Sequence, residues 1–421
     1  MLAIADLHIH SRFSRACSSD ITVKGLENAA VQKGIRILAS GDPVNANWLS
    51  ELKLNLEEDG TGLFKVKGSN TGVRFMLGGE LSTIYEYGGK SRRIHHCVFV
   101  RSFEAIDQLR ELLMPKGNLD SDGRPTLMMS SAELVESALE ADSKAFIFPA
   151  HAWTPYFGVL GSITGFDSIE EAYEDQAKHI HALETGLSSD PEMNWRLSKL
   201  DKYALVSNSD MHSMQKMGRE ANAFELDKLT YNNIVDSISK KDSRHFKFTI
   251  EYYPEEGKYH YDGHRQCNFS ANPETYKSSI CPVCGKKLVI GVLHRVEELA
   301  DRPKGFVPKN AIPYKKTVPL IEVLAYVMHK SSYSSAVKEA YGKMIAELGS
   351  EFHILLEEGI ENIAASTGSE VATAIDNIRK GNVHIEPGYD GVFGVIDLLN
   401  REKQKQEVKR QKTLFSNHDR L

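Results

Sequence analysis

Two histidines one residue apart follow the first apolar run of the chain, in the stretch "ADLHIHSR" at residues 5–12. In an extended strand, residues i and i+2 point to the same face, so His8 and His10 project together while Leu7 and Ile9 point the other way. Two imidazoles on one face can share a metal ion. Two ordinary polar residues at a strand end would also explain the pattern, so the rest of the chain has to decide.

Further potential metal ligands follow later apolar runs. They are Asp42 in "ASGDP", Glu80 in "LGGE", His95 and His96 in "RIHHCVFV", His151 in "FPAHAW", and Asp210 and His212 in "SNSDMHS". Imidazoles and carboxylates are ligands for Zn²⁺, Mn²⁺ and Fe²⁺. Any one of these residues is weak evidence, but so many at successive strand ends indicate a metal site.

The elements that must position these side chains alternate between short strands and helices over residues 1–240. Strands are predicted at 2–6, 35–39, 74–77, 95–100, 145–149, 182–184 and 204–207, and helices at 23–33, 103–113 and 131–140. This alternation favours a parallel α/β barrel or a doubly wound sheet. In a barrel the strand C-termini meet on one face, which would gather the candidate ligands.

A second candidate metal site lies in the cysteine-containing region. His264 and Cys267 form one pair, and Cys281 and Cys284 in "CPVCG" form another, which is the spacing of a structural tetrahedral zinc site. His260 is an alternative fourth ligand, and two buried thiols without a metal are the simpler interpretation. Several basic residues lie nearby, so the module could contact DNA: Arg265, Lys286, Lys287 and Arg295. A purely structural role is the alternative.

Composition and charge describe an ordinary globular protein. The chain has 421 residues, 41% hydrophobic and 26% charged, and an odd number of cysteines, five, which argues against a disulfide framework. Its net charge of −6 hides basic segments at 241–320 (+5) and 401–421 (+4), which would suit a polyanionic substrate, although solvated charged faces explain them equally well. There is no signal peptide and no run near the ~20 apolar residues of a membrane span, so we expect a cytoplasmic protein without membrane contact.

The chain divides into four predicted parts. A barrel at 1–240 is followed by a zinc-binding module at 241–310, a helical domain at 311–395 and a flexible tail at 396–421. In the tail, "QKTLF" at 411–415 matches the QxxLF pentapeptide with which bacterial proteins engage the β sliding clamp, with Gln411, Leu414 and Phe415 as the contacts. The alternative is that Leu414 and Phe415 pack back onto the body.

The ordered motifs HxH, GDP, GGE, HH, PAH and SDMH resemble the polymerase and histidinol phosphatase (PHP) superfamily. The resemblance implies a distorted (β/α)7 barrel with a centre of two or three metal ions, which would be zinc, manganese, iron or magnesium. It implies one ion on His8, His10, Glu80 and Asp210, a second on Glu80, His96 and His151, and a third on Asp42 and His212. The pattern does not separate His95 from His96.

This chain departs from the PHP pattern at two positions. Asp42 stands where the superfamily usually has a histidine, and the ligand often found shortly after the HxH falls on Ala16, with Asp20 as the nearest replacement. Both departures concern the third ion. Metal ions of this kind lower the pKa of bound water and neutralise phosphate charge, so phosphoester hydrolysis is expected, with Glu80 and Asp210 as the central catalytic residues.

The segments "GVLHRVEELADRP" and "GNVHIEPGYDGVFG" extend the resemblance, which over the whole chain is to the endonuclease Q family. That resemblance implies a DNA repair endonuclease that cuts 5′ of deaminated bases (uracil, hypoxanthine, xanthine) and abasic sites after extruding the lesion. The tail motif indicates a bacterial member, and we expect a monomer in the cytoplasm at the nucleoid. The alternatives are a phosphatase or exonuclease on small phosphoesters, or a non-catalytic scaffold that binds DNA and the clamp.

Overall fold

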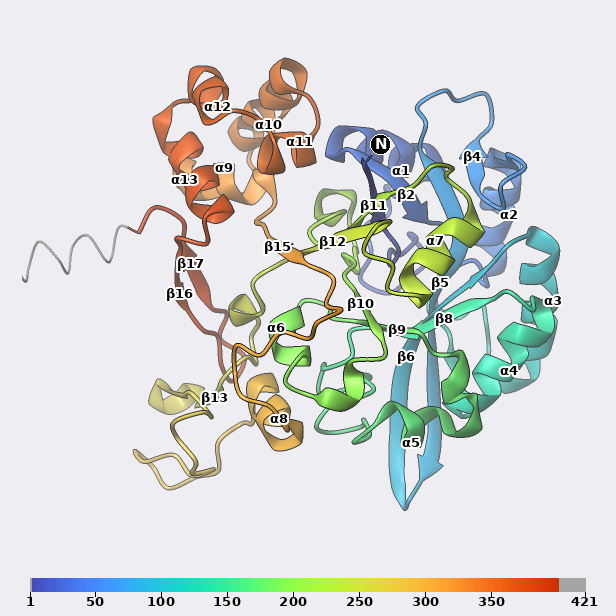
Figure 1. The fold of residues 1–421 in the computed structure, drawn as a ribbon, viewed down its shortest axis with the longest axis horizontal. Helices are drawn as coiled ribbons and strands as arrows, with labels where there is room; N and C mark the ends of the chain where they lie inside the picture. The colour runs from blue at the N-terminus through green and yellow to red at the C-terminus, as the bar shows by residue number, and fades with distance from the viewer. Residues whose placement is uncertain (1, 401–421) are drawn as a thin grey trace, which may run out of the picture.

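The structure is a computed structural model and describes residues 2–400. Its centre is a large mixed sheet with the strand order β15-β12-β11-β1-β2-β5-β4-β3, in which β6 pairs with β5 and β8, and β7 pairs with β5 (Figure 1). The strands are β1 (Leu2–Asp6), β2 (Ile35–Ala39), β3 (Leu56–Glu58), β4 (Phe64–Val66), β5 (Arg74–Tyr87), β6 (Lys90–Val100), β7 (Thr126–Leu127), β8 (Phe146–Pro149), β11 (Ala221–Glu225), β12 (Phe246–Glu251) and β15 (Tyr314–Lys316). A separate parallel pair, β9 (Ala182–Glu184) and β10 (Ala204–Val206), follows β8 in the chain.

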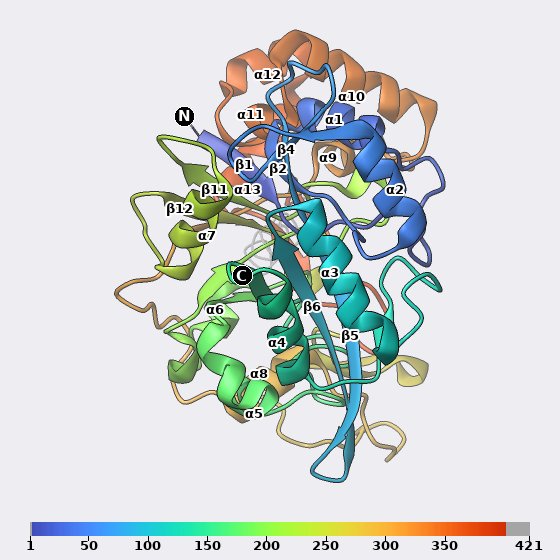
Figure 2. The same ribbon diagram turned by 90° about the vertical axis from the view of Figure 1, so that its right-hand side faces the viewer.

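Helices surround this sheet (Figure 2). They are α1 (Val23–Lys33), α2 (Ala46–Asn55), α3 (Phe103–Leu113), α4 (Ser131–Ala141), α5 (Ile169–Tyr173), α6 (Pro191–Asn194) and α7 (Tyr231–Ser239). Their starts follow from local chemistry, because the side chains of Thr22 and Ser102 accept hydrogen bonds from the first-turn amides, and Ser130 forms a capping box with Glu133. The helices predicted at 23–33 and 103–113 are therefore found with the same bounds.

The predicted α/β class is confirmed, but the strands do not all run parallel. β1–β2 and β2–β5 are parallel pairs, whereas β5–β6, β6–β8 and β1–β11 are antiparallel. The antiparallel pair β5–β6 is a long hairpin, whose turn is made by Gly88 and Gly89 at φ 59° and 72°. Consecutive glycines with positive φ are a typical two-residue hairpin turn. The sequence prediction recognised only the first part of β5 and the last part of β6.

The main sheet continues past the boundary predicted at residue 240. β12 pairs with β11, and β15, which follows the cysteine-containing segment, pairs with β12. The chain therefore leaves the sheet after β12 and returns to it at β15. Between these strands lie the hairpin of β13 (Asp262–His264) and β14 (Phe269–Ala271) and the helix α8 (Val292–Leu299).

The C-terminal helices form their own lobe beside the sheet (Figure 1). They are α9 (Leu320–Met328), α10 (Ser335–Leu348), α11 (Glu351–Leu356), α12 (Ile360–Thr367) and α13 (Ser369–Arg379). They enclose a separate hydrophobic cluster that includes Leu324, Ile363 and Ile375. A short hairpin, β16 (His384–Glu386) and β17 (Val395–Asp397), follows, so the predicted helical domain is helical from 320 to 379. The clamp motif with Gln411, Leu414 and Phe415 lies outside the described residues.

Candidate metal centre

Four of the predicted ligands meet at one point. His8 and His10 follow β1, Glu80 lies within β5 and Asp210 follows β10, and each offers a ligand atom within 4.8 Å of the others. His10 Nε2 lies 3.0 Å from Asp210 Oδ1 and 3.3 Å from Glu80 Oε2. The first ligand set expected from the sequence is therefore brought together by the fold.

A second group lies on the other oxygen of Glu80. His151 Nε2 is 2.9 Å and His95 Nδ1 is 2.7 Å from Glu80 Oε1. The three side chains again offer ligand atoms within 4.8 Å of one another. Glu80 thus stands between the two groups with one oxygen toward each, which is the arrangement of a carboxylate that bridges two ions.

The structure places His95, and not the predicted His96, beside Glu80 and His151. Glu80 pairs with Cys97, and Ser82 pairs with His95, in the β5–β6 register. Paired residues of antiparallel strands point to the same face, and so do residues two apart on one strand, so His95 shares the face of Glu80 and His96 takes the opposite face. There the His96 ring contacts the Tyr173 hydroxyl at 2.7 Å and Thr83 Oγ1 at 3.0 Å.

Asp42 and His212, the expected third ligand set, both lie next to His10. Asp42 Oδ1 is 3.0 Å from His10 Nδ1, and its Oδ2 accepts hydrogen bonds from the Ser11 amide and the Ser14 hydroxyl. The His212 ring lies 4.8 Å from the His10 ring, centroid to centroid. Asp42 is placed to orient His10 from behind. Asp20, the weaker candidate, is exposed.

Sequence reasoning missed Glu184 and Arg124. Glu184 ends β9, is 1% exposed, and has both carboxylate oxygens about His8 Nδ1, at 3.1 and 3.0 Å. The strand-end pattern that found the other ligands would also have found Glu184. Arg124 Nη1 donates to Glu80 Oε2 at 2.8 Å from an irregular loop, for which the sequence carries no comparable signal.

Three of the candidate ligands have a strained backbone. Asp42, His151 and Asp210 have φ values of 39°, 31° and 45°, a region that side chains other than glycine seldom adopt. Each such residue costs on the order of 1–3 kcal/mol and persists only where the surrounding structure enforces it. Strain of this kind is typical of a functional site.

The electrostatics of the site keep Glu80 ionised and His95 neutral, whereas burial alone would lower the pKa of His8 and His10 but the charged groups around them raise it well above its usual range. Burial alone would raise the pKa of Glu80, but His95, His8 and Arg124 hold it well below its usual range. Burial lowers the pKa of His95 to about 4, so this imidazole is neutral near pH 7. Neutral imidazoles and ionised carboxylates are the metal-binding forms of these groups.

One buried atom directly supports a cation in this centre. His8 Nε2 is buried and has no hydrogen-bond partner within residues 2–400, and it lies 3.6 Å from both Glu80 Oε2 and Asp210 Oδ1. A buried polar atom without a partner is costly, and a metal ion between these three groups would satisfy it. The mixed imidazole and carboxylate donors fit zinc, manganese or iron.

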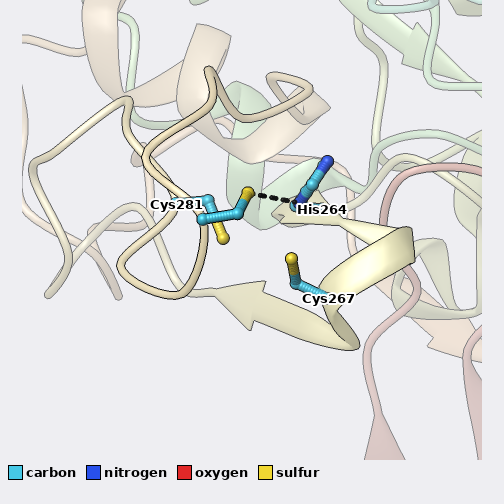
Figure 3. A group of neighbouring side chains, drawn as sticks. His264, Cys267 and Cys281 are labelled. Atoms are coloured by element: carbon cyan, nitrogen blue, oxygen red, sulfur yellow. Dashed lines mark hydrogen bonds between the residues drawn. The ribbon is translucent and has the colours of Figure 1, made fainter.

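The cysteine module brings its four predicted zinc ligands together. His264, Cys267, Cys281 and Cys284 offer ligand atoms within 4.8 Å of one another, and His264 Nδ1 lies 3.4 Å from Cys284 Sγ. Figure 3 shows the sulfurs and the imidazole turned toward a common point. His260 is instead buried beside Tyr261, outside this group, so the structure favours His264.

Comparison with known proteins places this architecture in a family. Residues 319–382 match the family described as the MJ0043 C-terminal domain. The crystal structure of the lesion-specific endonuclease PfuEndoQ from Pyrococcus furiosus is 32% identical, covers 94% of this chain and 95% of its own, and superposes with a TM-score of 0.83. The chain belongs to the endonuclease Q family.

Two further proteins are similar to the chain. A solved complex of endonuclease Q with a 27-mer duplex substrate, with an abasic lesion at the active site, is 33% identical over 94% of this chain and 96% of its own, with a TM-score of 0.82. The uncharacterized protein MJ0043 of Methanocaldococcus jannaschii is 33% identical over 256 residues, which are 59% of this chain and 31% of that protein. This endonuclease Q family member thus spans about a third of the length of MJ0043. No described helix is long and apolar enough to cross a membrane.

Proposed function

We propose that this protein is a metal-dependent DNA repair endonuclease that hydrolyses the phosphodiester on the 5′ side of a damaged nucleotide. The observation that carries the proposal is Glu80, a fully buried carboxylate that faces two groups of imidazoles with its two oxygens. The solved relative that holds an abasic-lesion duplex, similar over nearly the whole chain, supports DNA as the substrate.

The residues of the site have distinct roles in this proposal. His8, His10, Glu80 and Asp210 would hold one divalent ion, and Glu80, His95 and His151 would hold a second. When bound, such ions lower the pKa of water and neutralise charge on the phosphate. Asp42 holds the orientation of the His10 ring, and Glu184 holds that of the His8 ring, each through a contact with Nδ1 of that ring. Asp210 is 28% exposed, so it lies where substrate can reach the centre.

The finer substrate and partner assignments are part of the same proposal. Deaminated bases (uracil, hypoxanthine, xanthine) and abasic sites are the proposed lesions. A nucleotide whose base is damaged or absent costs the least unstacking energy to extrude. The zinc module would hold one structural zinc. The tail motif would attach the enzyme to the sliding clamp, which would bring a cytoplasmic, monomeric enzyme to replicated DNA at the nucleoid.

A nicking assay tests the proposal. Full-length protein is incubated with duplexes that carry uracil, hypoxanthine or an abasic site, and with an undamaged duplex, in the presence of Mg²⁺, Mn²⁺ or Zn²⁺. We expect cleavage only of the damaged strands, and loss of cleavage in D210N with retained lesion binding. D227N, which changes an exposed aspartate, is the matched control. Hydrolysis of nucleoside monophosphate esters without nicking of any damaged duplex would overturn the proposal in favour of a phosphatase.

A further inference from the structure

Arg124 introduces a positive charge into a centre built to bind cations. Its Nη1 donates to Glu80 Oε2 at 2.8 Å, on the same oxygen that His10 Nε2 approaches at 3.3 Å. Among residues 2–400, Arg124 is the one arginine or lysine that forms an ion pair with a residue of the two candidate metal sites that share Glu80. This contact competes directly with a metal ion for Glu80.

The loop that carries Arg124 is held tightly over the centre. The Gly123 amide donates to the Phe13 carbonyl at 3.0 Å, and the Pro125 carbonyl accepts from the Ser82 amide at 3.1 Å. A Cβ atom at Gly123 would lie 2.3 Å from Ser14 Oγ and 2.4 Å from Asp42 Oδ2, so only glycine allows this approach. Arg124 is therefore presented to the site by a fixed backbone.

Arg124 also borders the opening of the centre. The side chains of Arg124, Asp210 and His212 are 24%, 28% and 33% exposed, whereas those of His8, His10 and Glu80 are fully buried. These three side chains are the most exposed among the residues of the centre, since those of His95 and His151 are 7% and 11% exposed. Asp210 and His212 are candidate metal ligands, so among these three residues Arg124 is the one whose positive charge attracts an anion.

Charge balance gives Arg124 a defined role once the centre is loaded. Divalent ions held by Glu80 would repel a guanidinium that contacts the same carboxylate, and strongly so because the site is poorly hydrated. A phosphate group bound to the guanidinium would offset this repulsion, and arginine is well suited to bind phosphate through paired hydrogen bonds. Groups of this kind stabilise charge on a reacting phosphate.

We propose that Arg124 binds a non-bridging oxygen of the phosphodiester that is cut. This inference rests on the proposed endonuclease function and adds a substrate-binding residue to it. It differs from a purely structural role, in which Arg124 serves only as the counter-ion of Glu80. In that case, loss of Arg124 would alter the centre itself and would not depend on the charge of the substrate.

The assignment is tested by measuring DNA binding while both the arginine of the protein and the charge of the scissile phosphate are changed. Full-length D210N protein, with and without R124A, is titrated with a duplex that carries an abasic site. The second duplex is identical except for a neutral methylphosphonate at the scissile position. R15A is the matched control, because Arg15 is exposed on the neighbouring loop and its amide contacts Asp122, which lies in the Arg124 loop. Thermal unfolding shows whether each variant is folded.

We expect R124A to weaken binding of the ordinary duplex by roughly tenfold or more, the usual value of a hydrogen bond to a charged group, and R124K to weaken it less. On the methylphosphonate duplex R124A should change little, and R15A should have the same effect on both duplexes. Equal weakening by R124A on both duplexes, or none on either, would overturn the Arg124 assignment alone. If the D210N parent binds the lesion duplex no better than an undamaged duplex, the proposed function is overturned, and the Arg124 assignment with it.

Discussion

Glu184 contacts the edge of the His8 ring that faces away from the metal centre, with His8 Nδ1 3.0 Å from Glu184 Oε2. The same carboxylate accepts hydrogen bonds from the His151 amide at 2.7 Å and from Asn208 Nδ2 at 2.8 Å. One buried acid therefore fixes the orientation of one candidate ligand and the backbone of another. Carboxylates behind ligating histidines commonly hold the ring and increase its basicity.

We expect E184Q to weaken metal binding by 10- to 100-fold, because the amide cannot replace the carboxylate behind His8. Competition with a chromogenic chelator measures this affinity. E351Q is the control, since Glu351 is equally buried but pairs with Lys33 at 2.7 Å, remote from the candidate ligands. E351Q should lower stability and leave metal affinity unchanged. Unaltered metal affinity in E184Q would contradict the role given to Glu184.

The neighbouring histidines of β6 give opposite predictions. H95A should remove one metal ion per chain and abolish nicking, because His95 faces Glu80. H96A should retain the metal and lower the free energy of unfolding by about 1–3 kcal/mol, because it leaves the buried Tyr173 hydroxyl without its partner. Metal analysis and urea denaturation separate the two effects. Loss of metal in H96A but not in H95A would reverse the assignment.

The zinc module should depend on Cys281, which is 1% exposed. C281S should reduce the tightly bound zinc by one ion per chain after dialysis against a chelator, because it removes one ligand of four. Limited proteolysis should then cut within the segment between β12 and α8, which has few apolar residues of its own. K286A alters an exposed residue of the same turn and should retain the zinc. A C281S protein with full zinc content would refute the site.

His260 should make stability depend on pH. Burial lowers its pKa to about 4, from an ordinary value of 6.5. The unfolded chain therefore binds this proton at a higher pH than the folded chain, so stability decreases as the pH falls from 6.5 toward 4, by up to roughly 3 kcal/mol. In H260L this loss should shrink, as measured by urea denaturation across that range with zinc present. H384N, which removes an exposed histidine, is the control. An identical pH profile in H260L and the parent would contradict the prediction.

The clamp motif can be tested apart from catalysis. Simultaneous replacement of Gln411, Leu414 and Phe415 by alanine should abolish capture by an immobilised sliding clamp, because the apolar pair and its glutamine are lost. Nicking of short duplexes should be unchanged. K412A, within the same motif, should still be captured. Capture of the triple variant would show that the match to the motif is coincidental.

Local sequence determined the class of the fold and most of the site. The helices α1 and α3 have their predicted bounds because capping side chains and apolar spacing act within a few residues. His8 and His10 were found because the alternation of a strand is also local. The same holds for the candidate zinc ligands Cys281 and Cys284, whose turn contains Gly285 at φ 71°.

Tertiary structure decided which residues share a face and a centre. His95 and His96 are equivalent in sequence, and only the pairing of β6 with β5, across the Gly88-Gly89 turn, turns His95 toward Glu80. Arg124 lies in a loop without periodic pattern and reaches Glu80 only because Gly123 permits close packing on Asp42. Strand register and loop packing depend on contacts between distant parts of the chain, and no local pattern encodes them.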